Sequence, residues 1–277
     1  NGAGKTTTIR ILTGLAKATS GRVWVAGQEI GGDGLEVRRK IGYLPEEPAF
    51  YPWMSPVEYL DYVGRIFGLT GKERSIRTRE LLEMAGLTDV GKRKIGGFSR
   101  GMRQRLGLAQ ALVNRPEVLF LDEPVSALDP AGRKDVLDLI EGLAKQCTVF
   151  MSTHILADVE RVCDTIGILS HGKLVIEARR EDLLAQYVTP VFELEAQNGN
   201  SAELAKWVEG IRRMPWVVSA RVEGYVARVT VRDIDAARRE LLSTVIQAGL
   251  EIDRYQILKP SLEDVFLRLV QEEGKQK

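Results

Sequence analysis

The chain has 277 residues, enough for one large and one small domain, and 44% of them are apolar, so a sizeable core can form. Its 39 lysine and arginine residues nearly balance 38 acidic residues, which gives no electrostatic reason to expect nucleic acid as a partner. Two cysteines are too few for a disulfide framework and favour a reducing compartment, and the sequence has no apolar run long enough to cross a bilayer.

The first seven residues form the second half of a phosphate-binding loop: Asn1, Gly2, Ala3, Gly4, Lys5, Thr6 and Thr7. Glycines allow backbone N–H groups to surround phosphates, the lysine reaches the outer phosphates, and the hydroxyl of the first threonine binds Mg²⁺. A helix is predicted over 6–15, with its N-terminus directed at the anion. Because the first glycine of the loop would precede Asn1, we expect a fragment that lacks its first strands.

Two short strands are predicted next, over 22–26 and 41–44. Three helices follow and are expected to form a helical subdomain over about 50–115; they are predicted over 55–67, 73–85 and 99–113. The first of these helices has Ser55 as N-cap, Pro56 at its first position and Glu58 completing a capping box.

A run of four apolar residues, 118–121, predicts a buried parallel strand that ends in two carboxylates. Asp122 is placed to hold Mg²⁺ through water, and Glu123 to polarise an attacking water as a general base. Taken alone, the segment also fits a buried strand that leads into a helix cap. A helix over 131–145 and a strand over 147–151 continue the alternation that is typical of an α/β sheet.

The segment 98–105 lies between these two motifs. Ser99 is predicted to cap a helix, and Gly101 would let a phosphate approach the backbone closely. In this order, the segments resemble the ABC ATPase family, and the resemblance implies that Ser99 and Gly101 contact the ATP held by the opposite subunit. Arg100 and Met102 stand where that family usually has glycine and glutamine. This variant resembles the branch of exporters that handle drugs, antibiotics or sodium through a separately encoded permease.

Three further segments are similar to functional loops of the same family. Asp129, in the segment 126–129, corresponds to the loop that crosses the dimer interface. His154 corresponds to the switch histidine that contacts the γ-phosphate. Glu46 stands where the loop between the nucleotide site and the permease usually has glutamine; its carboxylate can still interact with Mg²⁺ or its waters.

The resemblance implies an α/β P-loop ATPase that binds ATP and Mg²⁺, with Glu123 and His154 as catalytic residues. It also implies head-to-tail dimerisation, as a homodimer or a heterodimer, beneath a membrane permease at the cytoplasmic face. The aromatic residues in 50–54 either contact that permease or pack under the helix over 55–67. The alternative is a soluble ABC ATPase that acts on DNA or ribosomes, but the chain has no sustained heptads and only one ATPase unit. A non-hydrolysing regulatory subunit is disfavoured because the lysine, carboxylate and histidine positions are all filled.

The motifs stop near residue 188, so we expect an ATPase domain over 1–187 and an accessory domain over 188–277. The predicted order of strands and helices in the second domain, β-α-β-β-α-β, is that of a ferredoxin-like α+β unit with one added helix over 261–271. Three residues are predicted to lie in its core: Val217, Val229 and Ile246. The segment 259–266 resembles the tail of the same exporter branch. The domain is expected to regulate or stabilise the dimer, or to be a structural appendage.

Overall fold

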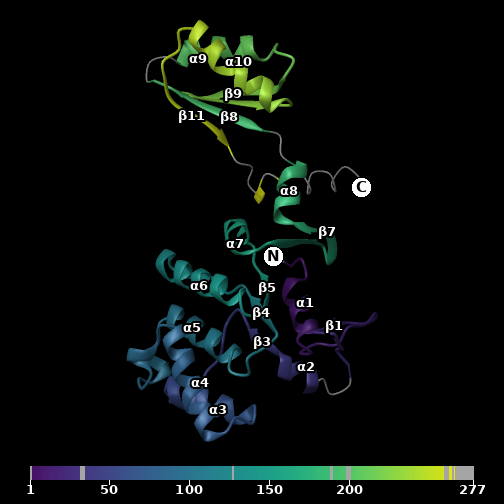
Figure 1. Cartoon of the computed structure of the whole chain (residues 1–277), viewed down its shortest axis with the longest axis vertical. Coiled ribbons are helices and arrows are strands. Elements are labelled where there is room, and N and C mark those ends of the chain that lie inside the picture. Colours follow the sequence, from purple (N-terminus) through teal and green to yellow (C-terminus); the bar gives the residue numbers. More distant parts are fainter. Residues whose placement is uncertain are drawn as a thin grey trace. The chain divides into compact units, whose positions relative to one another are not determined.

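The computed structural model describes residues 2–31, 35–126, 128–187, 190–197 and 201–258, together with 262, 263 and 265. The chain divides into two compact units, Asn1–Glu177 and Ala178–Lys277 (Figure 1). Within the described residues, no helix has the length and apolar character needed to cross a membrane.

A parallel sheet forms the centre of the first unit. It has the order β3-β4-β5, with β3 at Ile41–Leu44, β4 at Val118–Asp122 and β5 at Thr148–Ser152. The predicted buried parallel strand is confirmed, since Leu119 and Leu121 of β4 are fully buried. Helices α1 (Lys5–Leu12) and α2 (Leu35–Lys40) precede β3 in the chain, whereas α6 (Pro130–Leu143) follows β4 and α7 (Leu156–Val162) follows β5. Because β4 and β5 run in the same direction, the loops after their carboxyl ends meet at one edge of the sheet.

Three packed helices form the predicted helical region: α3 (Pro56–Ile66), α4 (Gly71–Met84) and α5 (Arg100–Ala111). Short 3-10 turns, Thr88–Val90 and Ile95–Gly97, join α4 to α5. The predicted capping box of α3 is confirmed, because the Glu58 N–H donates to Ser55 Oγ and the Ser55 N–H donates to the Glu58 carboxylate. These helices share one buried core with β4 and α6, so the first unit is continuous from the sheet to the helical region.

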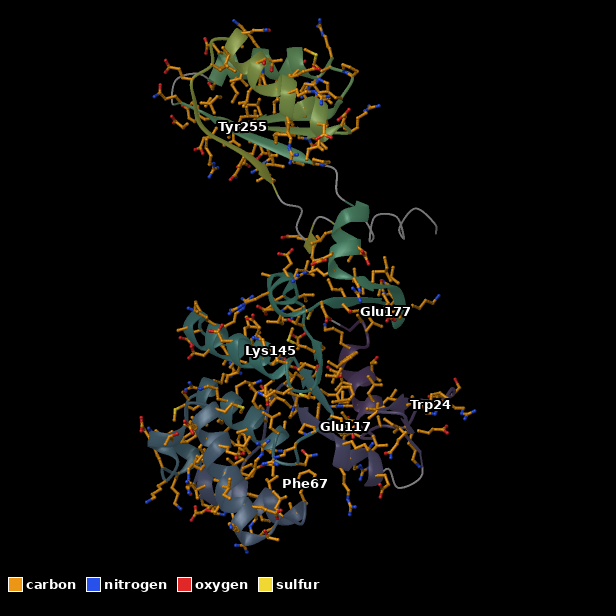
Figure 2. The ribbon with its side chains drawn as sticks, in the orientation of Figure 1. Trp24, Phe67, Glu117, Lys145, Glu177 and Tyr255 are labelled. Carbon is orange, nitrogen blue, oxygen red and sulfur yellow. The ribbon has the colours of Figure 1, made fainter. Side chains whose placement is uncertain are left out.

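Two short hairpins complete the first unit. In the first, β1 (Trp24–Val25) pairs with β2 (Gln28–Glu29), and Figure 2 shows Trp24 projecting from it. This strand is shorter than the predicted one, because Ala26 and Gly27 both have positive φ and form the tight turn. The second hairpin joins β6 (Thr165–Ser170) to β7 (Lys173–Arg179) through His171 and Gly172, which also have positive φ.

The second unit contains a four-stranded antiparallel sheet in the order β11-β8-β10-β9. Its elements are α8 (Arg180–Tyr187), β8 (Val191–Ala196), α9 (Ser201–Ile211), β9 (Val217–Glu223), β10 (Val226–Val231), α10 (Ile234–Gln247) and β11 (Ile252–Leu258). Helices α9 and α10 cover one face of the sheet (Figure 1). From β8 to β11 the order is β-α-β-β-α-β, so the predicted ferredoxin-like unit is confirmed.

The core of this unit confirms two of its three predicted residues. Val217 and Val229 are buried, but the prediction for Ile246 is wrong, since its side chain is 76% exposed. The buried face of α10 carries Ala237, Leu241 and Val245, which are spaced by four residues. One residue further along a helix turns the side chain by about 100°, so Ile246 lies on the outer side of that face.

Some predictions fall outside the described residues. These are the position of Asn1 in the phosphate-binding loop, the segment 259–266 and most of the helix over 261–271. Within that last helix, residues 262, 263 and 265 are described and helical. Leu262 and Val265 are buried.

Candidate functional site

The phosphate-binding loop is a glycine turn at the start of α1. Gly2 and Gly4 have φ values of 82° and 102°, a region that favours glycine over residues with a Cβ atom. The Thr8 hydroxyl donates to Gly4 O at 2.9 Å, and the Gly172 N–H donates to Ala3 O at 3.0 Å. The turn is therefore held from both sides, by its own helix and by the β6–β7 hairpin.

The two carboxylates lie at the carboxyl end of β4. Asp122 and Glu123 are both buried, at 1% and 6% exposure. Glu123 has a φ of 47°, an uncommon value for a residue other than glycine, and its N–H donates to Ser152 O at 3.0 Å. The Ser152 hydroxyl donates to Asp122 Oδ1 at 2.6 Å. The end of β5 thus fixes both carboxylates at the end of β4.

Glu123 contacts two other residues that the sequence predicts for the site. Lys5 Nζ lies 3.4 Å from Glu123 Oε1. His154 Nδ1 lies 2.9 Å from Glu123 Oε2, within hydrogen-bond distance. Residues separated by more than a hundred positions in the sequence are thus joined in one polar cluster, which we call the Glu123 cluster: Lys5, Glu123 and His154. The cluster contains a cation, a carboxylate and an imidazole, the groups required to bind a phosphate and to move a proton.

The oxygen groups predicted to bind Mg²⁺ lie next to this cluster. The Thr6 hydroxyl is 3.3 Å from Asp122 Oδ1, so the two oxygens face each other. A hydroxyl and a carboxylate are the hard oxygen ligands that Mg²⁺ prefers, and this ion usually completes its shell with phosphates and water. In the described part of the chain, no group of three or more His, Cys, Asp or Glu side chains is placed to hold a metal by itself. The residues present therefore fit a Mg²⁺ ion that arrives with a nucleotide.

Glu46 is exposed in the loop that follows β3. Because Leu44 pairs with Leu121 in the parallel register, this loop leaves the sheet beside the loop that carries Asp122 and Glu123. No hydrogen bond or ion pair among the described residues joins Glu46 to either carboxylate. Its interaction with Mg²⁺ stays a prediction.

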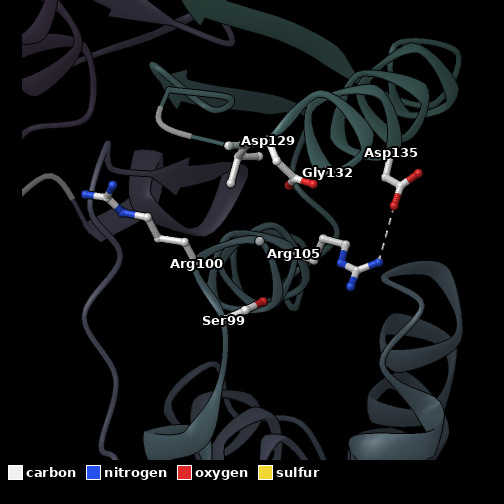
Figure 3. Close-up of a pocket in the computed structure, with 8 residues that line it drawn as sticks. Ser99, Arg100, Arg105, Asp129, Gly132 and Asp135 are labelled. Carbon is white, nitrogen blue, oxygen red and sulfur yellow. Dashed lines mark ion pairs between the residues drawn. The ribbon is translucent and has the colours of Figure 1, made fainter.

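A separate cavity lies at the start of α5, with a volume of about 240 Å³. Its lining residues come from α5 and from the segment that begins α6: Ser99, Arg100, Gly101, Arg105, Leu128, Asp129, Gly132 and Asp135. Ser99 is the N-cap of α5, as predicted, because its Oγ accepts the Met102 N–H at 3.2 Å. Figure 3 shows Asp129 and Gly132 facing α5 across the cavity, and Arg105 pairing with Asp135 at 3.7 Å. Ser99, Gly101 and Asp129 are thus brought together, apart from the Glu123 cluster.

Two residues near the site have contacts that the sequence does not predict. Ser152 contacts the Asp122 carboxylate and the backbone N–H of Glu123, and its only sequence signal is its place at a strand end two residues before His154. Tyr43 of β3 lies near Asp122; burial and the charge of Asp122 raise the pKa of Tyr43. A partly buried strand residue gives no sequence signal of such a neighbour.

The aromatic segment 50–54, which precedes α3, has some residues that pack under the helix and others that are exposed enough to contact a partner. Phe50 and Met54 pack against the buried core. Tyr51 and Trp53 are 43% and 66% exposed, with ring centroids 5.3 Å apart, and the Tyr51 ring also lies 6.0 Å from that of Tyr62. Part of the segment therefore supports α3, and its other part, together with Tyr62 of α3, forms an exposed aromatic patch: Tyr51, Trp53 and Tyr62.

Comparison with known families matches both units. Residues 1–126 match the ABC transporter family. Residues 179–270 match the C-terminal domain of DrrA1-3-like ATP-binding proteins. The second match begins within two residues of the start of the second unit, at Ala178.

Individual relatives extend over nearly the whole chain. It is 43% identical over 271 residues to the uncharacterized ABC transporter ATP-binding protein YxlF of Bacillus subtilis, covering 98% of this chain and 88% of that protein. It is 35% identical over 272 residues to the bacitracin transport ATP-binding protein BcrA of Bacillus licheniformis, covering 98% and 86%. A solved dimeric structure of the ATP-binding cassette MJ0796, bound to ADP and Pi after hydrolysis, is 28% identical with a TM-score of 0.58, covering 64% of this chain and 81% of that chain.

Proposed function

This chain belongs to the ATP-binding subunits of ABC transporters, which are ATPases, and we propose that it powers an exporter by closing and reopening a dimer around ATP. The observation that carries the proposal is the Glu123 cluster, which joins the phosphate-binding loop, the end of β4 and the loop after β5. Lys5 binds the outer phosphates, and His154 contacts the γ-phosphate. Positioning and electrostatics provide most of the rate acceleration in such phosphoryl transfer.

Glu123 is the general base of this proposal. Its carboxylate is fixed on one side by His154 and on the other by Lys5, at 2.9 Å and 3.4 Å. The positive φ of Glu123 and the hydrogen bond from its N–H to Ser152 O fix the backbone of this residue. The direction of its Cα–Cβ bond is therefore fixed as well, which limits the rotamers that the side chain can adopt. A carboxylate held in this way can accept a proton from a water that attacks the γ-phosphate.

Mg²⁺ is the proposed cofactor besides ATP. The Thr6 hydroxyl and Asp122 would hold it, with Glu46 near its waters. When bound, the ion neutralises the charge that develops on the phosphates. Ser152 supports this arrangement, because its 2.6 Å hydrogen bond orients the Asp122 carboxylate.

The ATP of one subunit is proposed to meet Ser99, Gly101 and Asp129 of a second subunit. Ser99 and Asp129 are exposed at the cavity, where a partner can reach them. A Cβ atom at Gly101 would meet only Leu128 Cδ2, at 4.0 Å, so packing within this chain does not require glycine there. The glycine is explained if a phosphate from outside the chain approaches its backbone closely.

The permease is proposed to bind the exposed aromatic patch at the cytoplasmic face of the membrane. Aromatic residues that are exposed together are enriched in protein interfaces. One relative is named for bacitracin transport and another, from Streptomyces coeruleorubidus, for daunorubicin resistance, so we propose an antibiotic or drug as the class of cargo. The rival function on DNA or ribosomes is not favoured, because these relatives are transporter subunits and the near-neutral charge offers nucleic acid little attraction.

The substitution Glu123→Gln in the full-length protein tests the proposed base. The amide keeps the shape of the side chain but cannot accept a proton, so we expect ATP to bind while turnover falls by about 100-fold or more. ATP should then hold a stable dimer, detectable by size-exclusion chromatography. Glu117→Gln is the matched control, since this exposed residue precedes the same strand and pairs only with Lys40 among the described residues. Near-normal turnover in Glu123→Gln would remove Glu123 from the catalytic role.

The substitution Ser99→Arg tests the composite site. Because Ser99 serves the nucleotide of the partner, we expect the variant to lose ATP-dependent dimerisation while the monomer still binds ATP. Fluorescent-nucleotide binding and light scattering measure the two effects separately. Ser75→Arg, on the exposed surface of α4, introduces the same side chain away from the cavity and should change neither. Equal losses of monomer binding and dimerisation would show that Ser99 does not act across the interface.

A further inference from the structure

We propose that the ion pair between Arg133 and the buried Asp158 is a positioning element that links the segment around Asp129 to the loop of His154. The proposal rests on the proposed function, in which Asp129 faces the partner subunit and His154 faces the nucleotide of its own subunit. The pair would transmit the arrival of the partner to the catalytic cluster. Neither residue touches the reacting atoms, so both act through the residues that they hold.

The geometry of the pair is specific. Arg133 Nε and Nη2 both donate to Asp158 Oδ1, at 2.8 Å and 2.5 Å. The Asp158 side chain is only 1% exposed, whereas that of Arg133 is 32% exposed. Two donors from one planar guanidinium converge on one carboxylate oxygen, which restricts the relative position of the two side chains more than a single flexible ammonium would.

The Arg133 end of the pair is tied directly to Asp129. Asp129 is the N-cap residue of α6, and the Arg133 N–H donates to Asp129 O at 2.8 Å, in the first turn of that helix. Asp129 also lines the cavity that contains Ser99. A displacement of Asp129 by a partner subunit would therefore move the backbone of Arg133 with it.

Local hydrogen bonds also link Asp158 to the turn that contains His154. The Ile155 N–H donates to Thr153 Oγ1 at 3.0 Å, and the Asp158 N–H donates to Ile155 O at 3.1 Å. These bonds close two consecutive turns, so one compact loop holds both His154 and Asp158. The position of the imidazole beside Glu123 therefore depends on where Asp158 is held.

The energetics indicate positioning rather than stability as the role of the pair. Asp158 Oδ2 is buried and has no hydrogen-bond partner among the described residues. A pair that buries a carboxylate with one unsatisfied oxygen gains little net stability, because the cost of desolvating that carboxylate offsets the attraction. The same two helices are also joined by Arg161 and Asp138, an ion pair whose side chains are 33% and 51% exposed. This exposed pair provides a matched control with the same chemistry and the same helices.

The experiment compares Asp158→Asn, Arg133→Lys and the control Asp138→Asn in the full-length protein. We expect Asp158→Asn and Arg133→Lys to lower kcat by about 10- to 100-fold, the range for a catalytic group displaced by up to 1 Å, with KM for ATP nearly unchanged. ATP-dependent dimerisation, measured in the Glu123→Gln background, should weaken as well. Amide exchange of 153–156 should become faster in both variants. Asp138→Asn should leave all these quantities at their unsubstituted values.

Each outcome decides between the alternatives. If Asp158→Asn and Arg133→Lys lower only the melting temperature while kcat and amide exchange match Asp138→Asn, the pair is structural and the inference is wrong. If Asp158→Asn does not fold, Arg133→Lys keeps the charge and decides the question by the same measurements. Failure of the proposed function has a different signature, since Glu123→Gln would then retain near-normal turnover.

Discussion

At the scale of single residues, the carboxylate proposed as the general base belongs to a residue with a strained backbone. Glu123 has a positive φ, which costs a residue with a Cβ atom about 1–3 kcal/mol and persists only where the surroundings enforce it. The Ser152 backbone and the ring of His154 supply that constraint. The strain and the Glu123 cluster thus occur at the same residue, as expected for a site that must direct one side chain.

Glu193 offers a prediction about pH at the same scale. It is buried in β8, where its carboxylate accepts from Arg228 Nε at 2.8 Å, from Gln256 Nε2 at 2.9 Å and from Arg254 Nη2 at 3.1 Å. The hydrogen bond from Arg228 is the main cause that lowers the pKa of Glu193 in the folded protein. A lowered pKa contributes stability above the unfolded-state pKa, and that stability is lost as the pH falls through the folded-state pKa.

We therefore expect Glu193→Gln to destabilise the second unit at neutral pH, and the difference from the unsubstituted protein to shrink as the solution becomes acidic. Calorimetric melting of the full chain from about pH 8 to pH 3 measures this. Glu195→Gln is the control on the same strand, because Glu195 is 40% exposed and pairs only with Arg254 among the described residues. A pH-independent difference for Glu193→Gln would contradict the assigned role of its charge.

At the scale of helices and strands, the sequence predicts the elements that carry their own boundary signals. The strand at 118–121 is bounded by Pro116 and Asp122, and α3 begins with a capping box and a proline. Helix α2, helix α7 and the β6–β7 strands were not predicted. They are short or depend on tertiary contacts: α2 has six residues and buries Val37, and α7 is held by Asp158.

The candidate site shows the same contrast between residues with local sequence signals and contacts that depend on tertiary packing. Motifs predict the candidate site residues, because glycine turns, paired carboxylates and helix caps have local signatures; the chemical roles of these residues stay predictions. The partners of those residues were not predictable, since Ser152 contacts Asp122 across thirty positions and Arg133 contacts Asp158 across twenty-five. Such contacts are decided by the packing of whole elements, which a local pattern does not encode. The error at Ile246 has the same origin: the residue is apolar, but the packing of α10 buries Val245 instead.

The cap of α3 gives a prediction at this scale. Ser55→Ala removes the acceptor of the Glu58 N–H, which is 3.3 Å from Ser55 Oγ, and should lower the free energy of unfolding by about 1 kcal/mol. Urea denaturation of the first unit measures the change. The control Ser75→Ala lies on the exposed face of α4 and should be neutral or slightly stabilising, because alanine favours helix more than serine does. An equal effect of both substitutions would show that the capping box contributes nothing.

At the scale of the whole molecule, each unit has its own buried core. The second unit packs Phe192, Leu194 and Trp207 with residues from β9, β10 and α10, and this cluster contains no residue of the first unit. The cores of the first unit lie around α5 with β4 and around α1 with Val25. Separate cores are the physical condition for domains that fold independently. The motifs of the candidate phosphate site lie in the first unit, and a regulatory or dimer-stabilising role of the second unit stays a prediction.

The last prediction separates the two units by truncation. A full-length protein cut after Glu177 or after Tyr187 should retain a folded ATPase unit that binds nucleotide, with altered dimerisation or altered coupling of turnover to the permease. The two cuts differ by α8, which belongs to the second unit and contains the fully buried Leu183. We therefore expect the cut after Tyr187 to expose Leu183 and the resulting protein to aggregate more than the protein cut after Glu177.

Circular dichroism, nucleotide binding and light scattering distinguish the outcomes. Unfolding after both cuts would refute the division into two domains, and unchanged turnover with unchanged dimerisation would make the second unit a structural appendage.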